Sequence, residues 1–129
     1  MSAQPQTEPS VAVVDDEPEI GDIIERTLGK NYNVDIYTSA QQIFDALEDR
    51  QRYDVILCDL FMPQVSGRQV YDTIAEQWPG QADHLVFISG ISEDTARQDI
   101  LEGLDVPVLE KPFQLQDLRD TVGRTVEAH

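Results

Sequence analysis

Four short apolar runs constrain the fold of this chain more than any other feature, because each is followed by a residue suited to phosphate or metal chemistry. The runs occupy residues 11–14, 55–58, 85–88 and 106–109. They lead respectively into Asp15 and Asp16, into Asp59, into Ser89, and, after one intervening residue, into Lys111. If the runs are parallel strands of one sheet, their carboxyl ends converge on one edge.

The runs are nearly continuous in valine, isoleucine and leucine, which is typical of strands buried on both faces of a parallel sheet. A fifth run, Val34–Tyr37, leads only into threonine and serine. Between the runs, apolar residues recur at helical spacing, with caps and stops at the ends. The spacing predicts five helices: 18–28 with Gly29 as the stop, a second opening at Ser39, 67–78 ended by Pro79 and Gly80, 92–103, and 115–126.

This strict alternation of strands and helices predicts an α/β domain with a five-stranded parallel sheet and helices on both faces. Right-handed crossovers leave few topologies, and five strands suit the doubly wound, flavodoxin-like order 2-1-3-4-5. In that order the strand at 34–37 is an edge strand, which fits its lack of special residues. We expect residues 1–10 to be a flexible tail and residues 11–127 to be the domain.

The chain has 129 residues and a formal net charge of −16, with only two lysines. Such a surface repels polyanions, so we expect no direct binding to nucleic acid and no attraction to anionic membranes. No apolar run approaches membrane-spanning length, and the first ten residues do not form a signal peptide, so we expect no membrane insertion. The single cysteine, Cys58, lies within an apolar run and suits a buried thiol in a reducing, cytoplasmic setting.

Asp15, Asp16 and Asp59 would bring three carboxylates together, and their mutual repulsion is relieved by a hard divalent cation such as Mg²⁺. The competing interpretation is that Asp15, Asp16 and Glu17 only cap the helix that begins at Pro18. Asp59 favours the metal site, because it lies at another predicted strand end and the next helix is delayed beyond Pro63.

A carboxylate such as that of Asp59 can accept a phosphoryl group and form an acyl phosphate. Lys111 could neutralise the incoming charge, and Ser89 could donate its hydroxyl to a phosphoryl oxygen. Lys111 could equally be an ordinary surface lysine, and Ser89 a turn residue before Gly90. The residues in combination, each at a strand end, favour the phosphoryl site.

The chain resembles the receiver domains of two-component response regulators from about Val11 to Val126. The matching pieces are the stretches 13–18, 59–63, Gly67, 89–90 and 111–113. The resemblance implies that Asp59 accepts a phosphoryl group from a phosphohistidine of a histidine kinase or phosphotransfer protein. It also implies that Ser89 and Lys111 contact that group, and that the Lys111–Pro112 peptide bond is cis.

For the metal, the resemblance implies that Asp16, Asp59 and the backbone carbonyl of Phe61 bind Mg²⁺ directly, with Asp15 acting mainly through water. Two departures from the family pattern stand out. Val108 replaces the aromatic residue that often lies three positions before the lysine and turns inward on activation. Phe61 and Ile91 are apolar where the family controls access of water, so we expect them to slow hydrolysis of the acyl phosphate.

We therefore expect a phosphorylation switch rather than an enzyme, read by a downstream protein at the face formed by the fourth helix, fifth strand and fifth helix. The output is expected to be a partner protein, or the chain is a receiver taken from a larger hybrid kinase or regulator. Two alternatives are a degenerate receiver that only docks and a Mg²⁺-dependent phosphohydrolase. The hydrolase needs a second acid two residues after the nucleophile, where this chain has Phe61.

Overall fold

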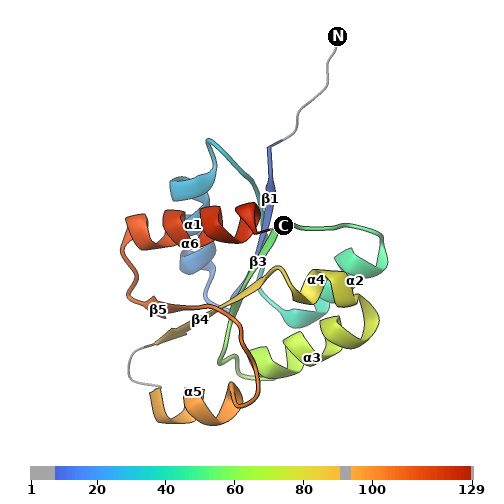
Figure 1. Ribbon diagram of the computed structural model, residues 1–129. Helices are drawn as coiled ribbons and strands as arrows, with labels where there is room; N and C mark the ends of the chain where they lie inside the picture. The colour runs from blue at the N-terminus through green and yellow to red at the C-terminus, as the bar shows by residue number, and fades with distance from the viewer. Residues whose placement is uncertain (1–7, 91–93, 129) are drawn as a thin grey trace.

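The computed structural model describes residues 8–90 and 94–128, and these form one five-stranded sheet (Figure 1). The strands are β1 (Ser10–Val14), β2 (Asn33–Tyr37), β3 (Val55–Asp59), β4 (Leu85–Gly90) and β5 (Val108–Lys111). Their order is β2-β1-β3-β4-β5, and every neighbouring pair is parallel. The predicted α/β fold and the predicted strand order are both confirmed.

Helices cover both faces of the sheet. They are α1 (Pro18–Leu28), α2 (Ala40–Glu48), α3 (Gly67–Gln77), α4 (Pro79–Ala82), α5 (Asp94–Ile100) and α6 (Leu115–Glu127). Helices α1 and α6 lie together on one face, and α2 and α3 lie on the other, in Figure 1. Because side chains alternate along a strand, Val11 and Val13 pack under α1 and α6 while Ala12 and Val14 pack toward α2 and α3.

Local sequence sets the starts of the helices. Pro18 occupies the first turn of α1, where its missing N–H removes a donor that would otherwise be unsatisfied. The Ser39 side chain accepts a hydrogen bond from the backbone of Gln42 at the start of α2. Ser66 and Gln69 form a reciprocal capping box at the start of α3. These caps hold the first turns of α1, α2 and α3 at the edge of the sheet where the functional residues lie.

The fold differs from the prediction in the number of helices, since the described residues contain six rather than five. Pro79 and Gly80 do end α3, but Pro79 also begins the extra short helix α4 before β4. The backbone N–H of Gln81 bonds to the carbonyl of Trp78, which closes this turn. A proline suits the first turn of a helix as well as the end of the preceding one, so the sequence signal was ambiguous.

The last strand begins two residues later than predicted, at Val108 rather than Val106. Pro107 has no backbone N–H to donate, and it contributes only its carbonyl, which accepts from the N–H of Phe87. The predicted start of the fourth helix at Ser92 lies outside the described residues. That helix, α5, ends at Ile100 rather than Gly103, and Gly103 adopts a positive φ of 82° in the turn that follows.

None of the helices formed by residues 8–90 and 94–128 is long and apolar enough to cross a bilayer.

Candidate phosphoryl and metal site

The carboxyl ends of four strands bring the predicted site residues to one edge of the sheet. Asp59 is the last residue of β3, Ser89 lies near the end of β4, and Lys111 is the last residue of β5. Asp15 and Asp16 directly follow β1. Since β1, β3, β4 and β5 are consecutive in the sheet, residues distant in sequence meet around Asp59.

Asp59 is held in place by its own loop and by the start of α3. The residue as a whole is only 4% exposed, and its Oδ1 accepts a hydrogen bond from the N–H of Phe61 at 3.2 Å. The N–H of Gly67 donates to the carbonyl of Leu60 at 2.8 Å. A Cβ at Gly67 would lie 2.8 Å from Leu60 Cα and 2.9 Å from the Asp59 carbonyl oxygen, so only glycine lets α3 begin against this loop.

Lys111 reaches the acidic side chains from the opposite side of the site. Its Nζ lies 3.2 Å from Glu17 Oε1, 3.4 Å from Asp15 Oδ2 and 3.7 Å from Asp59 Oδ2. Burial alone would lower the pKa of Lys111, but Asp59, Asp15 and Glu17 together outweigh it and raise that pKa. The ammonium group is therefore charged and shared among three carboxylates. The Lys111–Pro112 peptide bond is cis, as predicted.

The two buried carboxyl groups resist ionisation. Burial and the nearby Asp15 carboxylate raise the pKa of Asp59 from 3.8 to about 7, against the opposing effects of Lys111 and the Phe61 N–H. Burial also raises the pKa of Asp15, although the Glu17 N–H and Lys111 oppose this. A divalent cation would favour the ionised form of both groups, because its positive charge would compensate for the hydration that the carboxylates lose on burial.

In the part of the chain that the structure describes, the side chains of Asp15, Glu17 and Asp59 form an acidic cluster whose ligand oxygens all lie within 4.8 Å of one another. This acidic cluster has the all-oxygen donor set that Mg²⁺ or Ca²⁺ requires. Asp16 is exposed and does not belong to this trio, although it lines the hollow above Asp59. The sequence predicts only a helix-capping role for Glu17, whereas its side chain also reaches Lys111 and the cluster.

Capping nevertheless accounts for part of this segment. Glu17 is the N-cap residue of α1 but makes no capping bond with its side chain. Instead, Asp15 Oδ1 accepts the backbone N–H of Glu17 at 2.9 Å. The same carboxylate therefore orders the start of the helix and faces Lys111, so the two interpretations of this segment are not exclusive.

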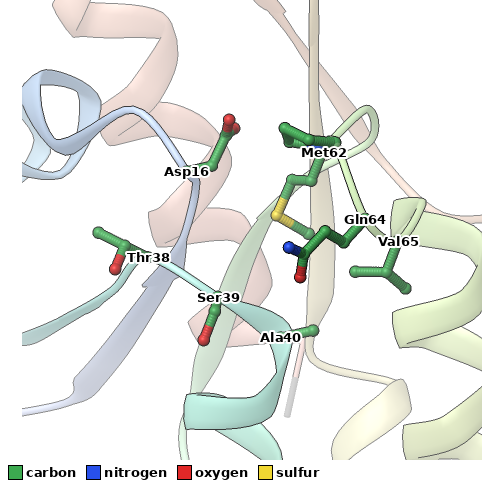
Figure 2. Close-up of a pocket in the computed structure, with 8 residues that line it drawn as sticks. Asp16, Thr38, Ser39, Ala40, Met62, Gln64 and Val65 are labelled. Carbon is green, nitrogen blue, oxygen red and sulfur yellow. The ribbon is translucent and has the colours of Figure 1, made fainter.

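Two adjoining hollows open beside these residues. The one above Asp59 has a volume of about 450 Å³ and is lined by Asp16, Glu17, Asp59, Phe61, Met62, Pro63, Gly90 and Lys111. A second, of about 260 Å³, lies between the loops that follow β1, β2 and β3, with Asp16, Ser39, Met62 and Gln64 on its walls (Figure 2). Asp16, Met62 and Pro63 line both. Asp59 itself lines the first hollow.

Ser89 does not itself line this hollow. Its side chain is fully buried, and its hydroxyl lies 3.4 Å from the carbonyl of Gly90. Gly90, the next residue, does line the hollow. Ile91 lies outside the described residues.

The model of the response regulator receiver domain matches residues 11–123. This match covers most of the chain and includes every residue of the site. The chain belongs to the response regulator receiver domain family. As a receiver domain it is a signalling module of two-component systems.

Curated relatives are longer proteins. The hydrogenase transcriptional regulatory protein HoxA of Cupriavidus necator is 35% identical over 127 residues, which cover 92% of this chain and 24% of HoxA. The response regulator protein PilR of Pseudomonas aeruginosa is 34% identical, over 85% of this chain and 24% of PilR. The chain thus spans about a quarter of the length of these relatives.

Solved structures share the fold at lower identity. The signal receiver domain of an HD domain-containing protein from Pseudomonas fluorescens matches with a TM-score of 0.82 and 19% identity, over 98% of this chain and 93% of that one. The receiver domain of a Francisella response regulator matches with a TM-score of 0.77 and 20% identity, over 94% and 98% of the two chains.

Proposed function

We propose that this receiver domain, residues 11–127, is a phosphorylation-dependent switch in which Asp59 accepts a phosphoryl group from a phosphohistidine of a partner histidine kinase or phosphotransfer protein. The observation that carries the proposal is the position of Asp59. It is a buried carboxyl group at the end of a central strand, it opens on a hollow, and the Lys111 ammonium lies 3.7 Å away.

In the proposed reaction, a carboxylate oxygen of Asp59 attacks phosphorus and the bond from phosphorus to the donor nitrogen breaks. The electron pair of that bond remains on the imidazole of the donor, and an acyl phosphate remains on Asp59. Lys111 offsets the negative charge on the transferred group, since its positively charged ammonium already lies beside Asp59. Ser89, near the end of β4, donates its hydroxyl to a phosphoryl oxygen.

The donor set fits a divalent cation, and we propose that Asp15, Asp16, Asp59 and the Phe61 carbonyl hold Mg²⁺. Bound Mg²⁺ would offset the charge of the carboxylates and of the incoming phosphoryl group. Asp59 and Asp15 are buried and face one another across the cluster, and Asp16 approaches it from the exposed rim. Glu17 lies near enough to this group that its own role needs a separate test.

We propose that the phosphorylated domain is read at the face formed by α5, β5 and α6. Arg97 of α5 and Glu110 of β5 form an ion pair at 3.0 Å that joins two elements of this face. Val108, which lies in β5 beside Phe87 of β4, cannot supply the inward-turning ring expected from the family. A change of packing along β5 and α5, rather than rotation of an aromatic side chain, would therefore carry the signal.

HoxA and PilR carry about three quarters of their length outside the matched region, so the output of this chain is either a separate protein or an attached region of the same kind of regulator.

We place the receiver in the cytoplasm, in keeping with a buried free thiol at Cys58. If the chain were instead a degenerate receiver that only docks to a partner, no phosphoryl donor would phosphorylate it.

Incubation with radiolabelled acetyl phosphate tests the proposal. The wild-type protein should take up label only when Mg²⁺ is present, and the label should be lost in alkali, as expected for an acyl phosphate. Asp59→Asn should take up none. Asp22→Asn, which removes an exposed carboxylate from α1, serves as the matched control and should label normally. Equal labelling of Asp59→Asn and the wild type would refute the assignment.

A further inference from the structure

The ammonium of Lys111 is closer to Glu17 than to the acceptor. The distance from Nζ to Glu17 Oε1 is 3.2 Å, whereas the distance to Asp59 Oδ2 is 3.7 Å. We propose that Glu17 is a positioning residue that holds Lys111 at the rim of the site and competes with the phosphoryl group for it. Glu17 therefore slows the loading of Asp59. This inference rests on the proposed function of Asp59 and Lys111.

The backbone of Glu17 is fixed, so its side chain has a defined starting point. Its N–H is bonded to Asp15 Oδ1, and the residue that follows is Pro18, which restricts the backbone on both sides of the bond between them. From this position the carboxylate of Glu17 reaches across the mouth of the hollow to Lys111. Glu17 lies outside the sheet, so no backbone pairing joins it to Lys111. The contact is thus made by side chains alone and can open without disturbing the sheet.

The three carboxylates around Lys111 differ in how easily they can release it. Asp15 and Asp59 have side chains that are 1% and 5% exposed, while that of Glu17 is 60% exposed. A buried carboxylate that loses its partner suffers the full cost of desolvation, whereas an exposed one is solvated by water. Glu17 is therefore the partner that gives way when a phosphoryl group arrives.

Release of Lys111 still costs the energy of one exposed ion pair before the lysine can serve the phosphoryl group. Pairs of this kind are weak, and their loss corresponds to a change of roughly two- to fivefold in rate. The contact therefore tunes the rate of loading and does not abolish it. Salt weakens exposed pairs, so the effect should shrink as ionic strength rises.

The experiment compares Glu17→Gln with Glu19→Gln in the full chain. Both variants remove one exposed carboxylate from the start of α1, and no ion pair joins Glu19 to Lys111 among the described residues. Phosphorylation of Asp59 is followed with acetyl phosphate and, separately, with phosphoramidate, whose protonated nitrogen lowers its net negative charge. Binding of Mg²⁺ is titrated for each variant by the change in melting temperature.

We expect Glu17→Gln to load roughly two- to fivefold faster than wild type with both donors, with unchanged affinity for Mg²⁺ and a smaller difference at high salt. Glu19→Gln should match wild type. Acceleration with acetyl phosphate alone would mean that Glu17 merely repels the more negative donor, and this overturns the proposal.

Three other outcomes also overturn it. The first is slower loading of Glu17→Gln with weaker Mg²⁺ binding, which would make Glu17 a metal ligand. The second is a loading rate of Glu17→Gln equal to that of wild type. The third is an equal acceleration in Glu19→Gln. Failure of the proposed function is distinguished at once, because the wild-type protein itself would then take up no phosphoryl group at Asp59.

Discussion

Lys111 Nζ lies 3.7 Å from Asp59 Oδ2 even though β4 separates the strands that carry them. The strand register explains this contact. Asp59 pairs with Ile88, whereas Lys111 pairs with Gly90, two residues further along β4. The backbone of Lys111 therefore lies beyond the end of β3. From there its long side chain can turn back over the strand end to the carboxylate of Asp59.

The raised pKa of Asp59 predicts that its ionisation destabilises the metal-free protein. In the unfolded chain the carboxyl ionises near 3.8, and in the folded protein near 7, so the folded state holds the proton more tightly between these values. The free energy of unfolding should therefore fall as pH rises through this window. Asp59→Asn removes the charge and should be more stable than wild type at about pH 8, by on the order of 2 kcal/mol.

Chemical denaturation in EDTA at several pH values measures this difference. The advantage of Asp59→Asn should shrink as pH falls from about 7 and vanish below the unfolded-state pKa of 3.8, where the carboxyl is protonated in both states. Asp22→Asn, an exposed site on α1, should show no comparable gain. A constant difference between Asp59→Asn and wild type across the whole range would contradict the assigned cause.

Mg²⁺ should stabilise the folded protein, because binding to the native state alone raises the free energy of unfolding. At a concentration of about ten times the dissociation constant, the gain is about 1.4 kcal/mol. The gain should vanish in Asp16→Asn if Asp16 is a ligand, and it should persist in Asp22→Asn. An undiminished shift of the melting temperature in Asp16→Asn would place the cation on Asp15, Glu17 and Asp59 instead.

Phe61 should slow hydrolysis of the acyl phosphate. It follows Asp59 by two residues, its N–H donates to Asp59 Oδ1, and its half-buried side chain lines the hollow. An apolar ring there offers no hydrogen bond to an attacking water, whereas an amide does. The phosphorylated wild type should therefore outlive phosphorylated Phe61→Asn severalfold, measured as loss of label after the donor is removed. Equal or longer half-lives in the variant would contradict this role.

Arg68 should stabilise the end of α5. Its guanidinium donates to the carbonyls of Ile100 and Glu102 at 2.8 and 3.0 Å, and it pairs with Asp72 at 3.2 Å. Replacement by alanine leaves those carbonyls without the donor and should cost about 1–2 kcal/mol. Amide hydrogen exchange should rise around residues 100–104.

Arg26→Ala, which changes an exposed arginine of α1, is the control for Arg68→Ala and should leave exchange at the end of α5 unchanged. Arg68→Lys should not restore protection fully, because an ammonium cannot reproduce the fixed fork of guanidinium donors. Full protection in Arg68→Ala would show that the turn after α5 holds without this contact.

The sheet could be predicted because its signals are local and repeated. Continuous apolar runs, turn residues and caps fixed which segments form strands, and crossover handedness then left one favoured order. The convergence of Asp15, Asp59 and Lys111 followed from that order alone. The start of β5 was placed too early because Pro107 lies within an apolar run, and only the hydrogen-bond ladder shows where pairing begins.

The contacts of Glu17 and Arg68 could not be predicted in the same way. Each depends on how far a long side chain reaches across a gap between elements, and spacing along the chain carries no information about that. Glu17 looked like a helix-capping acid, and its reach to Lys111 becomes visible only when the loops after β1 and β5 are placed together.

Whether Asp59 receives the phosphoryl group can be tested by chemical mapping of the modified residue. Borohydride reduces an aspartyl phosphate to homoserine, which mass spectrometry locates within a peptide. After incubation with a phosphohistidine donor and Mg²⁺, the account predicts homoserine at position 59 in the wild type and no conversion anywhere in Asp59→Asn. Conversion at Asp15 or Asp16 in the wild type, or a phosphoryl group carried by any other residue, would contradict it.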